Sequence, residues 1–204
     1  MTSSESVADN EAGGQEAGAF APTRKQFVWR AMERDDLETV HAIGEQVHPG
    51  FPERIEVFTE RLRLYAPGCR VLEADGQMAG YVISHPWHPM RPPKLDSLLV
   101  AMPTSPATFY IHDLALMPVA RGSGAGALAV SYLVAHAEAI GLADLSLVSV
   151  NASRPFWLRQ GFEVIESRGL SLALQSYDDN DACFMMRRLP LTPEGEMSDI
   201  ASRD

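Results

Sequence analysis

The sequence predicts one mixed α/β domain in which helices pack on a sheet, with the element order βααβββαβαββ. Apolar runs with strand-like spacing alternate with segments of helical periodicity between Phe27 and Leu189. Asp75-Gly76 separates two of the strand-like runs, as in a tight β-hairpin. A glycine-rich segment, Gly122–Gly126, lies between a strand and a long helix. Together these observations favour an α+β domain with a mixed sheet.

The first half of the domain should contain three strands and two helices. The strands are expected at Phe27–Met32, Cys69–Ala74 and Met78–Ser84, and the helices at about 36–47 and at Glu53–Tyr65. Asp35 or Asp36 can cap the first helix, and Pro67-Gly68 ends the second. A Pro-rich loop is expected from His85 to Ala107.

The second half should add four strands and two helices. The strands are expected at Thr108–Leu116, Leu145–Val150, Phe162–Ser167 and Cys183–Leu189, and the helices at Gly124–Ile140 and Ser153–Gln160. The longer helix carries one apolar stripe, formed by Val130, Leu133, Val134, Ala137 and Ile140. Gly161 ends the shorter one.

The composition is that of a globular domain with polar ends. Hydrophobic residues make up 46% of the 204 residues, which is enough for a core. Residues 1–25 and 192–204 lack hydrophobic periodicity and are predicted to be disordered tails, which leaves a domain at residues 26–191. The formal net charge of -10 argues against binding to nucleic acid. Two cysteines are too few for a disulfide framework, and both are expected to be reduced.

No segment predicts a signal peptide or a membrane span. The first 20 residues lack a basic region followed by an apolar one. No stretch approaches the roughly 20 apolar residues that a membrane-spanning helix needs. We therefore expect a cytoplasmic protein with no membrane partner.

The segment from Arg121 to Ala127 has the features of an anion-binding loop. Its three alternate glycines allow the backbone to approach a ligand closely, and the first turn of the following helix leaves N–H groups unpaired. A nucleotide P-loop would need a Lys and a Ser or Thr after the last glycine, but Ala127-Leu128 follow here. A dinucleotide fold would place the glycines directly after the strand and an acid at the end of the next one. Here Met117-Pro-Val-Ala-Arg intervenes, and Asn151 ends the next strand.

This arrangement resembles the GNAT superfamily of acetyl-CoA-dependent N-acetyltransferases, whose signature Q/R-x-x-G-x-G/A follows a strand and opens a helix. Arg121-Gly-Ser-Gly-Ala-Gly126 matches that signature at every position. A second family element, a short helix leading into a Gly-Phe pair and a strand, is similar to Arg154–Phe162. The order of elements from Phe27 to Leu189 is also similar, so the resemblance covers nearly the whole domain.

The resemblance implies that acetyl-CoA is the cosubstrate. The backbones of Leu114, Ala115 and Leu116 would pair with its pantetheine arm. The loop and first helical turn would hold its pyrophosphate through the N–H groups of Gly122, Ser123, Gly124, Ala125, Gly126 and Ala127. Arg121 would begin this loop. Alternatively, Arg121 is only a solvated residue at the helix start, and the glycines only form a tight turn.

His112 is the residue that we expect to act as the general base. An amine must lose a proton before it attacks a thioester, and an imidazole, with its ordinary pKa of about 6.5, can accept that proton directly or through water. Strand alternation predicts that Tyr110, His112 and Leu114 share one face. Asp113 should then lie on the opposite face. Tyr110 is expected either to donate a hydrogen bond in the site or simply to pack, and His112 could instead be a structural histidine.

Two positions depart from the family pattern. Many members carry a tyrosine four residues before the Gly-Phe pair, as proton donor to the CoA thiolate. Trp157 occupies that position here, and an indole N–H is not a general acid. The thiolate would then leave unprotonated, or Tyr110 or Ser153 would replace the tyrosine. The family's asparagine lies seven residues before that tyrosine, whereas Asn151 lies six before Trp157, so its contact with CoA is carried over with a shifted spacing.

The segment around His112 is similar to the arylalkylamine (serotonin) N-acetyltransferase branch of the family. There a His-x-His precedes Leu-Ala-Val, and here Tyr110-Ile-His112 precedes Leu114-Ala-Leu. The similarity implies a small primary amine, arylalkylamine-like or polyamine-like, as the substrate. Two alternatives stay open. One is a non-catalytic acyl-CoA-binding regulatory module, and the other is an acetyltransferase of a protein N-terminus or lysine.

The substrate pocket is predicted to come from two Pro-containing loops. Its residues would be Phe51, Glu53, His85 and Trp87. Either Glu53 or Glu45 could face a cationic amine, although these loops could equally fill the edge of the core. His85-x-x-His88 lacks a third ligand at a convincing spacing, so no metal is predicted. The resemblance also implies a homodimer, because the family often forms dimers, but the sequence itself does not give the oligomeric state.

Overall fold

The computed structural model describes residues 25–190, apart from the side chains of Ser171 and Leu172. The tails predicted at residues 1–25 and 192–204 therefore lie outside the described residues, except for Lys25. Among residues 25–190, no helix is long and apolar enough to cross a membrane.

In the described part of the chain, seven strands form one sheet in the order β1-β2-β3-β4-β5-β7-β6. Only β4 and β5 pair in parallel, and every other neighbouring pair is antiparallel. The mixed sheet confirms the predicted fold class. The strands are β1 (Phe27–Ala31), β2 (Cys69–Ala74), β3 (Gln77–Trp87), β4 (Thr108–Leu116), β5 (Asp144–Ser149), β6 (Glu163–Val164) and β7 (Cys183–Arg188).

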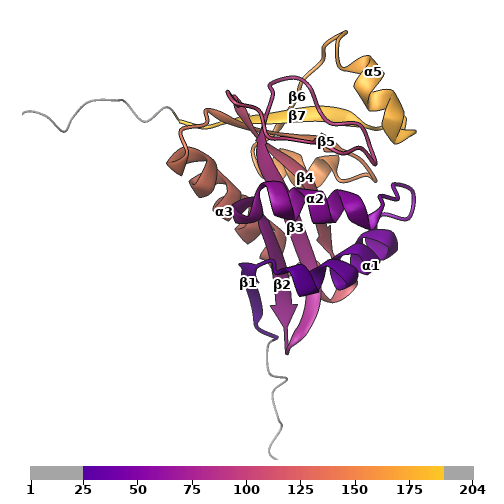
Figure 1. Cartoon of the computed structure of the whole chain (residues 1–204), viewed down its shortest axis with the longest axis vertical. Coiled ribbons are helices and arrows are strands. Elements are labelled where there is room, and N and C mark those ends of the chain that lie inside the picture. The colour runs from indigo at the N-terminus through magenta and orange to yellow at the C-terminus, as the bar shows by residue number, and fades with distance from the viewer. Residues whose placement is uncertain (1–24, 191–204) are drawn as a thin grey trace, which may run out of the picture.

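Helices cover both faces of this sheet (Figure 1). On one face lie α1 (Leu37–Val47) and α2 (Ile55–Leu64), and on the other lie α3 (Ala125–Ala139) and α4 (Arg154–Arg159). A short helix, α5 (Ser171–Leu174), and a 3-10 turn at Gln175–Tyr177 precede β7. The element order is the predicted one with α5 added.

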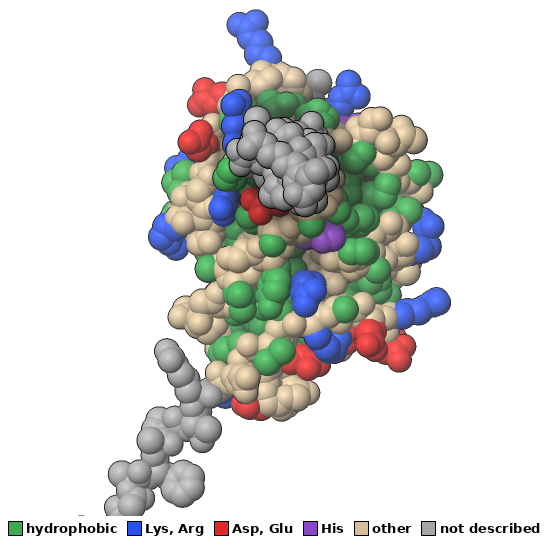
Figure 2. Space-filling view, turned by 90° about the vertical axis from the view of Figure 1, so that its left-hand side faces the viewer, with side chains coloured by type: hydrophobic (Ala, Val, Ile, Leu, Met, Phe, Trp, Pro, Cys, Tyr) green, Lys and Arg blue, Asp and Glu red, His purple; other side chains and the backbone are tan. Residues whose placement is uncertain are grey.

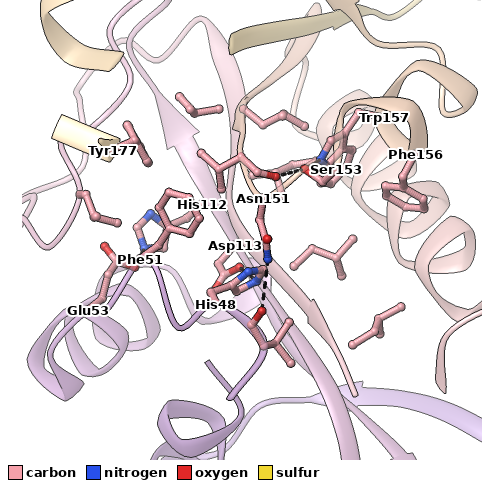
Figure 3. Close-up of a pocket in the computed structure, with 18 of the residues that line it drawn as sticks. His48, Phe51, Glu53, His112, Asp113, Asn151, Ser153, Phe156, Trp157 and Tyr177 are labelled. Carbon is pink, nitrogen blue, oxygen red and sulfur yellow. Dashed lines mark hydrogen bonds and ion pairs between the residues drawn. The ribbon is translucent and has the colours of Figure 1, made fainter. Parts of the chain in front are cut away.

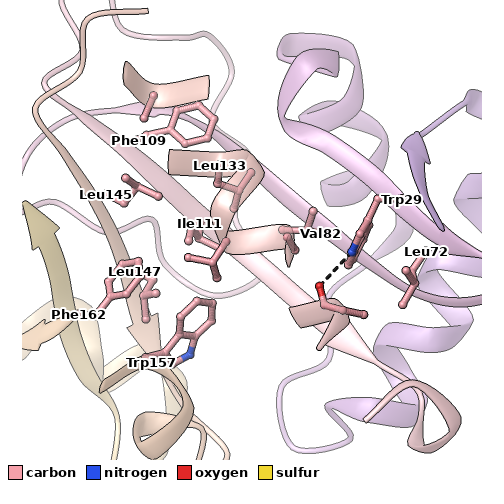
Figure 4. Packing of buried hydrophobic residues seen from close by; sticks show 14 of the residues in the cluster. Trp29, Leu72, Val82, Phe109, Ile111, Leu133, Leu145, Leu147, Trp157 and Phe162 are labelled. Atoms are coloured by element: carbon pink, nitrogen blue, oxygen red, sulfur yellow. Dashed lines mark hydrogen bonds between the residues drawn. The ribbon is translucent and has the colours of Figure 1, made fainter. Parts of the chain in front are cut away.

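The core consists of two main hydrophobic layers, one on each face of the sheet. The larger layer, on the α3 side, contains Trp29, Leu133 and Trp157 (Figure 4). The layer on the α1–α2 side contains Phe58. The indole N–H of Trp29 donates to the carbonyl oxygen of Ala125 at 3.0 Å. This bond attaches β1 to the start of α3, the helix whose first turn borders the site.

The strand β3 is longer than predicted, because it continues through His85 and Pro86 to Trp87. The sequence had suggested an end at Ser84, since proline cannot donate to a strand ladder. However, β2 pairs with β3 only as far as Ile83, so beyond that residue β3 has a hydrogen-bonded neighbour on the β4 side alone. A proline is tolerated where one side of a strand is free.

A β-bulge lies in β4 at His112. Asp113 pairs with Ile83, and Ile111 pairs with the next residue of β3, Ser84. His112 is therefore an extra residue that has no counterpart on β3. Such a residue interrupts the regular alternation of side chains along a strand.

The bulge overturns the faces predicted for Asp113 and Leu114. His112 and Asp113 both point toward side chains of the α1–α2 connection, and Leu114 packs with the α3 layer instead. The prediction that Leu114 shares a face with His112 was wrong, because the bulge adds one residue to the strand. Tyr110 and His112 do remain on one side, where both rings lie against His85.

The outer side of α3 is exposed to solvent. Leu128, Tyr132 and Ile140 are 46%, 43% and 41% exposed. Figure 2, which views the molecule from the side on which α3 lies, shows hydrophobic side chains interspersed with polar ones, and Lys or Arg and His side chains near the middle of this face. The expected homodimer stays a prediction, since the structure is that of a single chain.

Candidate active site

The candidate active site is a cavity of about 480 Å³ between the diverging strands β4 and β5. These strands pair only at Phe109 with Leu145 and at Tyr110 with Ser146. Beyond these pairs, residues 111–114 of β4 and the end of β5 line the cavity. Because parallel strands that separate leave backbone N–H and C=O groups unpaired, the gap can accept a ligand that carries amide groups.

Arg121, the first residue of the loop at residues 121–127, lines one end of the cavity. Gly122 and Gly124 have φ of +75° and +89°, a region that residues with a Cβ rarely adopt. The N–H of Ala125 donates to the Ser123 hydroxyl at 3.2 Å. Within the described chain, no acceptor faces the N–H groups of Gly122, Gly124, Gly126 and Ala127. These free donors, at the positive end of the α3 dipole, suit a pyrophosphate.

The glycine at position 126 serves packing as well as ligand access. A Cβ there would lie 3.2 Å from the ring of Phe156 and 3.3 Å from the side chain of Leu116. Glycine therefore lets α3 approach α4 and β4 closely. Arg121 lines the cavity beside this contact, and its Nε donates to the carbonyl oxygen of Leu116 at 3.1 Å.

Most of the other residues predicted to contact CoA line the cavity, but one of them belongs to the core. Leu114 and Leu116 line the cavity, whereas the side chain of Ala115 is buried in the α1–α2 layer. Asn151 lines the cavity at the end of β5, and its amide donates to the carbonyl oxygen of Val47 at 3.3 Å. Asn151 thus connects the two walls of the cavity.

At the other end of the cavity, His112 and Glu53 form a buried pair (Figure 3). Their side chains are 6% and 7% exposed, and His112 Nε2 lies 2.9 Å from Glu53 Oε2. The second carboxylate oxygen, Oε1, accepts the backbone N–H of Asp96 at 2.9 Å. A carboxylate beside Nε2 keeps a proton on that nitrogen, so Nδ1 carries the lone pair of the neutral ring. In the described part of the chain, Nδ1 has no hydrogen-bond partner.

A second histidine–carboxylate pair, His48 and Asp113, lies in the same cavity. His48 Nε2 is 3.1 Å from Asp113 Oδ1 without hydrogen-bond alignment, and the Tyr81 hydroxyl donates to Asp113 Oδ2. Burial alone would lower the pKa of His48, but the negative charge of Asp113 raises it. Burial would likewise raise the pKa of Asp113, but the charge of His48 and the Tyr81 hydroxyl lower it. The pair attaches the α1–α2 connection to β4.

His85 and Trp87, predicted to line the substrate pocket, do not reach the cavity. His85 is fully buried, with its ring 5.6 Å from that of Tyr110 and 6.3 Å from that of His112. Burial and the neighbouring His112 lower the pKa of His85 to about 3, so this ring is neutral. The Trp87 indole donates to the carbonyl oxygen of Arg91 at 2.7 Å. Both predictions fail because β3 continues through these residues and their side chains join the packing of the sheet.

Tyr110, predicted to act in the site, is 1% exposed and packs with Leu170 and Phe184 instead of lining the cavity. Tyr177 lines the cavity, and its hydroxyl donates to the carbonyl oxygen of Pro93 at 3.1 Å. Burial raises the pKa of Tyr177 to about 12. The sequence carried no signal for Tyr177, since it belongs to the 3-10 turn after the unpredicted α5.

Trp157 belongs to the core and borders the cavity with one edge. It is 6% exposed, and its ring centroid lies 4.9 Å from that of Phe156 and 5.4 Å from that of Phe162. Its indole N–H donates to Ser153 Oγ at 3.2 Å, and this hydroxyl lies 2.6 Å from the carbonyl oxygen of Val150, to which it donates. The indole N–H of Trp157 and the hydroxyl hydrogen of Ser153 therefore both form hydrogen bonds within the protein.

Of the remaining residues predicted for the substrate pocket, two line the cavity and one does not. Phe51 and Glu53 line the cavity, whereas Glu45 is exposed on α1. Sequence reasoning missed His48 as a site residue, although it lies in the same His-Pro-Gly-Phe-Pro segment as Phe51. It also missed Leu95, which comes from the long loop between β3 and β4.

Comparison with known proteins identifies one family. The sequence model described as the acetyltransferase (GNAT) family matches residues 29–162, which is most of the chain. No curated protein matches the sequence.

Several solved structures share the fold. The loading GNATL domain of CurA from Lyngbya majuscula matches with a TM-score of 0.66 and 12% identity, over 80% of this chain and 98% of that chain. The GphF GNAT-like decarboxylase in complex with isobutyryl-CoA has a TM-score of 0.65 and 16% identity, over 80% and 100%. The ribosomal-protein-S18-alanine N-acetyltransferase from Escherichia coli has a TM-score of 0.58 and 17% identity, over 83% and 98%. Identities this low show a common fold alone.

Proposed function

Because the chain belongs to the acetyltransferase (GNAT) family, we propose that it transfers an acetyl group from acetyl-CoA to the primary amine of a small, largely apolar molecule. The observation that carries this proposal is the His112–Glu53 pair. It lines the same cavity as Arg121 and Leu116, which adjoin the glycine loop.

Features of the glycine loop support a CoA site. Four N–H groups that have no acceptor among residues 25–190, with the guanidinium of Arg121, suit a pyrophosphate, and the separated edge of β4 suits the amides of pantetheine. Acetyl-CoA would supply a thioester carbonyl that an amine attacks, so that the C–N bond forms, the C–S bond breaks and CoA departs as its thiolate. The isobutyryl-CoA held by GphF supports an acyl-CoA as the class of ligand.

The chemistry assigned to this chain is the removal of a proton from the amine. His112 Nδ1 is the free basic atom, and it accepts the proton either directly or through a water molecule. Glu53 keeps the other ring nitrogen protonated and stabilises the positive charge that the ring then carries. Tyr110 has no part in this scheme, since it lies outside the cavity.

The end of the cavity that contains His112 and Glu53, which we call the acceptor end, has a lining that favours an arylalkylamine over a polyamine. Both carboxylates that line the cavity, Glu53 and Asp113, are already paired with histidines. A polyamine would need a free carboxylate for each additional ammonium group, whereas an arylalkylamine places an aromatic body against apolar walls. Those walls come from Phe51, Leu95, Leu147, Val148 and Tyr177.

The cover of the acceptor end favours a small molecule over a protein. Leu95 and Tyr177 lie at this end, and the hydrogen bond from Tyr177 to Pro93 joins two segments across it. A peptide backbone would need an open groove at this place.

Thiol release from acetyl-CoA with a panel of amines tests the proposal. Phenylalkyl- and indolylalkylamines should be acetylated with higher kcat/KM than spermidine or peptides. His112→Ala should lower kcat/KM by about 10²- to 10⁴-fold and leave the affinity for acetyl-CoA unchanged. Release with peptides alone would instead support a protein acetyltransferase. Binding of acetyl-CoA without release for any amine would support a regulatory module.

A further inference from the structure

A segment of the long loop between β3 and β4, residues 93–100, passes beside the acceptor end of the cavity; we refer to it as the strap. Its first part is attached to the turn before β7. The hydroxyl of Tyr177 donates to the carbonyl oxygen of Pro93 at 3.1 Å. The N–H of Leu95 donates to Ser176 Oγ at 3.3 Å.

The last part of the strap is attached to α2. The N–H groups of Leu99 and Val100 donate to the two carboxylate oxygens of Glu60, at 2.7 Å and 2.9 Å. The guanidinium of Arg61, which is fully buried, donates to the carbonyl oxygen of Ser97 at 2.7 Å. The strap is therefore held at both of its ends without any contribution from its middle.

The middle of the strap has its own attachment, between Arg54 and Asp96. The Arg54 backbone N–H donates to Asp96 Oδ1 at 2.9 Å, its Nε lies 3.1 Å and 2.9 Å from the two carboxylate oxygens, and its Nη2 donates to the Asp96 carbonyl oxygen at 3.2 Å. Asp96 has a φ of +53°, a left-handed conformation that Asp adopts more readily than most residues. Its N–H then points at Glu53 Oε1, 2.9 Å away.

We propose that Arg54 and Asp96 are positioning residues that hold the Asp96 N–H against Glu53 and so fix the orientation of the Glu53–His112 pair. The last torsion of a glutamate side chain rotates broadly between near-equivalent positions. A donor fixed on Oε1 leaves only Oε2 to face His112, which keeps the ring proton on Nε2 and the basic Nδ1 free. The inference deepens the proposed function, since it concerns the same base.

If Arg54 and Asp96 served only to stabilise the fold, their loss would lower the free energy of unfolding. The side chains of Arg54 and Asp96 are 60% and 36% exposed, and ion pairs this exposed add little to global stability. The strap also keeps its attachments to Tyr177 and Glu60 when the pair is lost. Losing the pair should therefore leave the fold intact and change only the geometry at Glu53.

The test compares Arg54→Ala with Arg30→Ala by proton NMR and steady-state kinetics. Arg30 makes a similar two-point ion pair with Asp36, at 2.7 Å and 2.8 Å, together with a bond to Glu73, and it lies on β1. The low-field Nε2 proton of His112, assigned by its absence in His112→Ala, should appear in the wild type and in Arg30→Ala. In Arg54→Ala it should broaden or vanish, and kcat/KM should fall by about 10- to 100-fold at unchanged acetyl-CoA affinity.

Two variants at Asp96 distinguish the contribution of its carboxylate from that of its left-handed backbone conformation. Asp96→Gly tolerates the positive φ but lacks the carboxylate, whereas Asp96→Asn keeps an acceptor for Arg54. We expect the Nε2 signal to persist in Asp96→Asn and to be lost in Asp96→Gly. A glycine variant that keeps both the signal and the rate would overturn the positioning role.

The outcomes also distinguish this inference from the proposed function. An active wild type whose Arg54→Ala variant retains signal and rate contradicts the positioning role alone. A wild type that acetylates no amine, but whose Nε2 signal responds to Arg54→Ala as expected, contradicts the proposed function and supports the positioning role.

Discussion

The two ends of the cavity are constructed from different parts of the chain. The glycine-loop end presents backbone N–H groups from the consecutive residues 122–127, whose conformation depends on glycines with positive φ. The acceptor end combines the side chains of Glu53 and His112 with the N–H of Asp96, from three separate segments. The first end depends on local backbone geometry, and the second on how distant segments pack. Substitutions at the acceptor end should therefore lower the rate of acetyl transfer, and substitutions at the glycine-loop end should weaken the binding of acetyl-CoA.

The largest expected effect is at the acceptor end. Glu53→Gln removes the negative charge that stabilises a protonated His112, so kcat/KM should fall about 10³-fold, which corresponds to about 4 kcal/mol in the barrier. Steady-state kinetics and calorimetric titration with acetyl-CoA measure the two functions separately. Glu45→Gln, at an exposed carboxylate on α1, serves as the control. A variant that loses acetyl-CoA affinity but retains kcat would contradict the division between the two ends.

A smaller effect is expected from His48→Gln, between the two ends. It replaces the positive charge beside the partly buried Asp113 carboxylate with a neutral amide, which should cost about 2 kcal/mol of unfolding free energy. Because the folded-state pKa of His48 is raised, this stabilisation is complete below the unfolded-state pKa and is lost as the pH rises through the folded-state value. Asp113, whose pKa is lowered, stays ionised throughout that window.

Urea unfolding at several pH values checks this dependence. The difference between wild type and His48→Gln should be larger at about pH 6 than at about pH 9. His88→Gln, at an exposed histidine, should show no such trend. A pH-independent difference would mean that His48 acts through packing and not through its charge.

The glycine-loop end should respond through affinity. Gly124→Ala places a Cβ at a φ of +89°, which costs about 1–2 kcal/mol and shifts the N–H groups of the loop. The Kd for acetyl-CoA should rise about tenfold, while kcat at saturation stays near the wild-type value. Gly50→Ala is a matched control, since it has no positive φ and a Cβ there meets nothing within 4 Å. An unchanged Kd with a lowered kcat would reverse the assignment of the two ends.

The smallest effect is expected at Trp157. Trp157→Phe removes the hydrogen bond to Ser153 and part of the buried ring, which should lower the unfolding free energy by about 1 kcal/mol. Since the indole N–H is already bonded to Ser153, kcat should change by less than about threefold. Thermal unfolding and steady-state kinetics measure both quantities. A tenfold fall in kcat would show that the indole takes part in the reaction.

Local signals in the sequence determined the order of the elements and one end of the cavity. Hydrophobic periodicity located the seven strands and the helices other than α5, and Asp75 and Gly76, with φ of +54° and +75°, form the expected tight turn. The signature from Arg121 to Gly126 is contiguous, so its residues lie together in any fold that retains the turn. A property carried by neighbouring residues can be predicted from their order.

The tertiary structure alone decided the other end. The bulge at His112 arises from the register between β3 and β4, which leaves no mark in the pattern of residue types. It placed Asp113 on the same side of the sheet as His112, and the continuation of β3 removed His85 from the pocket. Asp96 reaches Glu53 because the strap is attached at both ends and Arg54 bonds to Asp96 in its middle. Contacts between residues far apart in the sequence depend on register and packing, and these follow from the free energy of the whole fold.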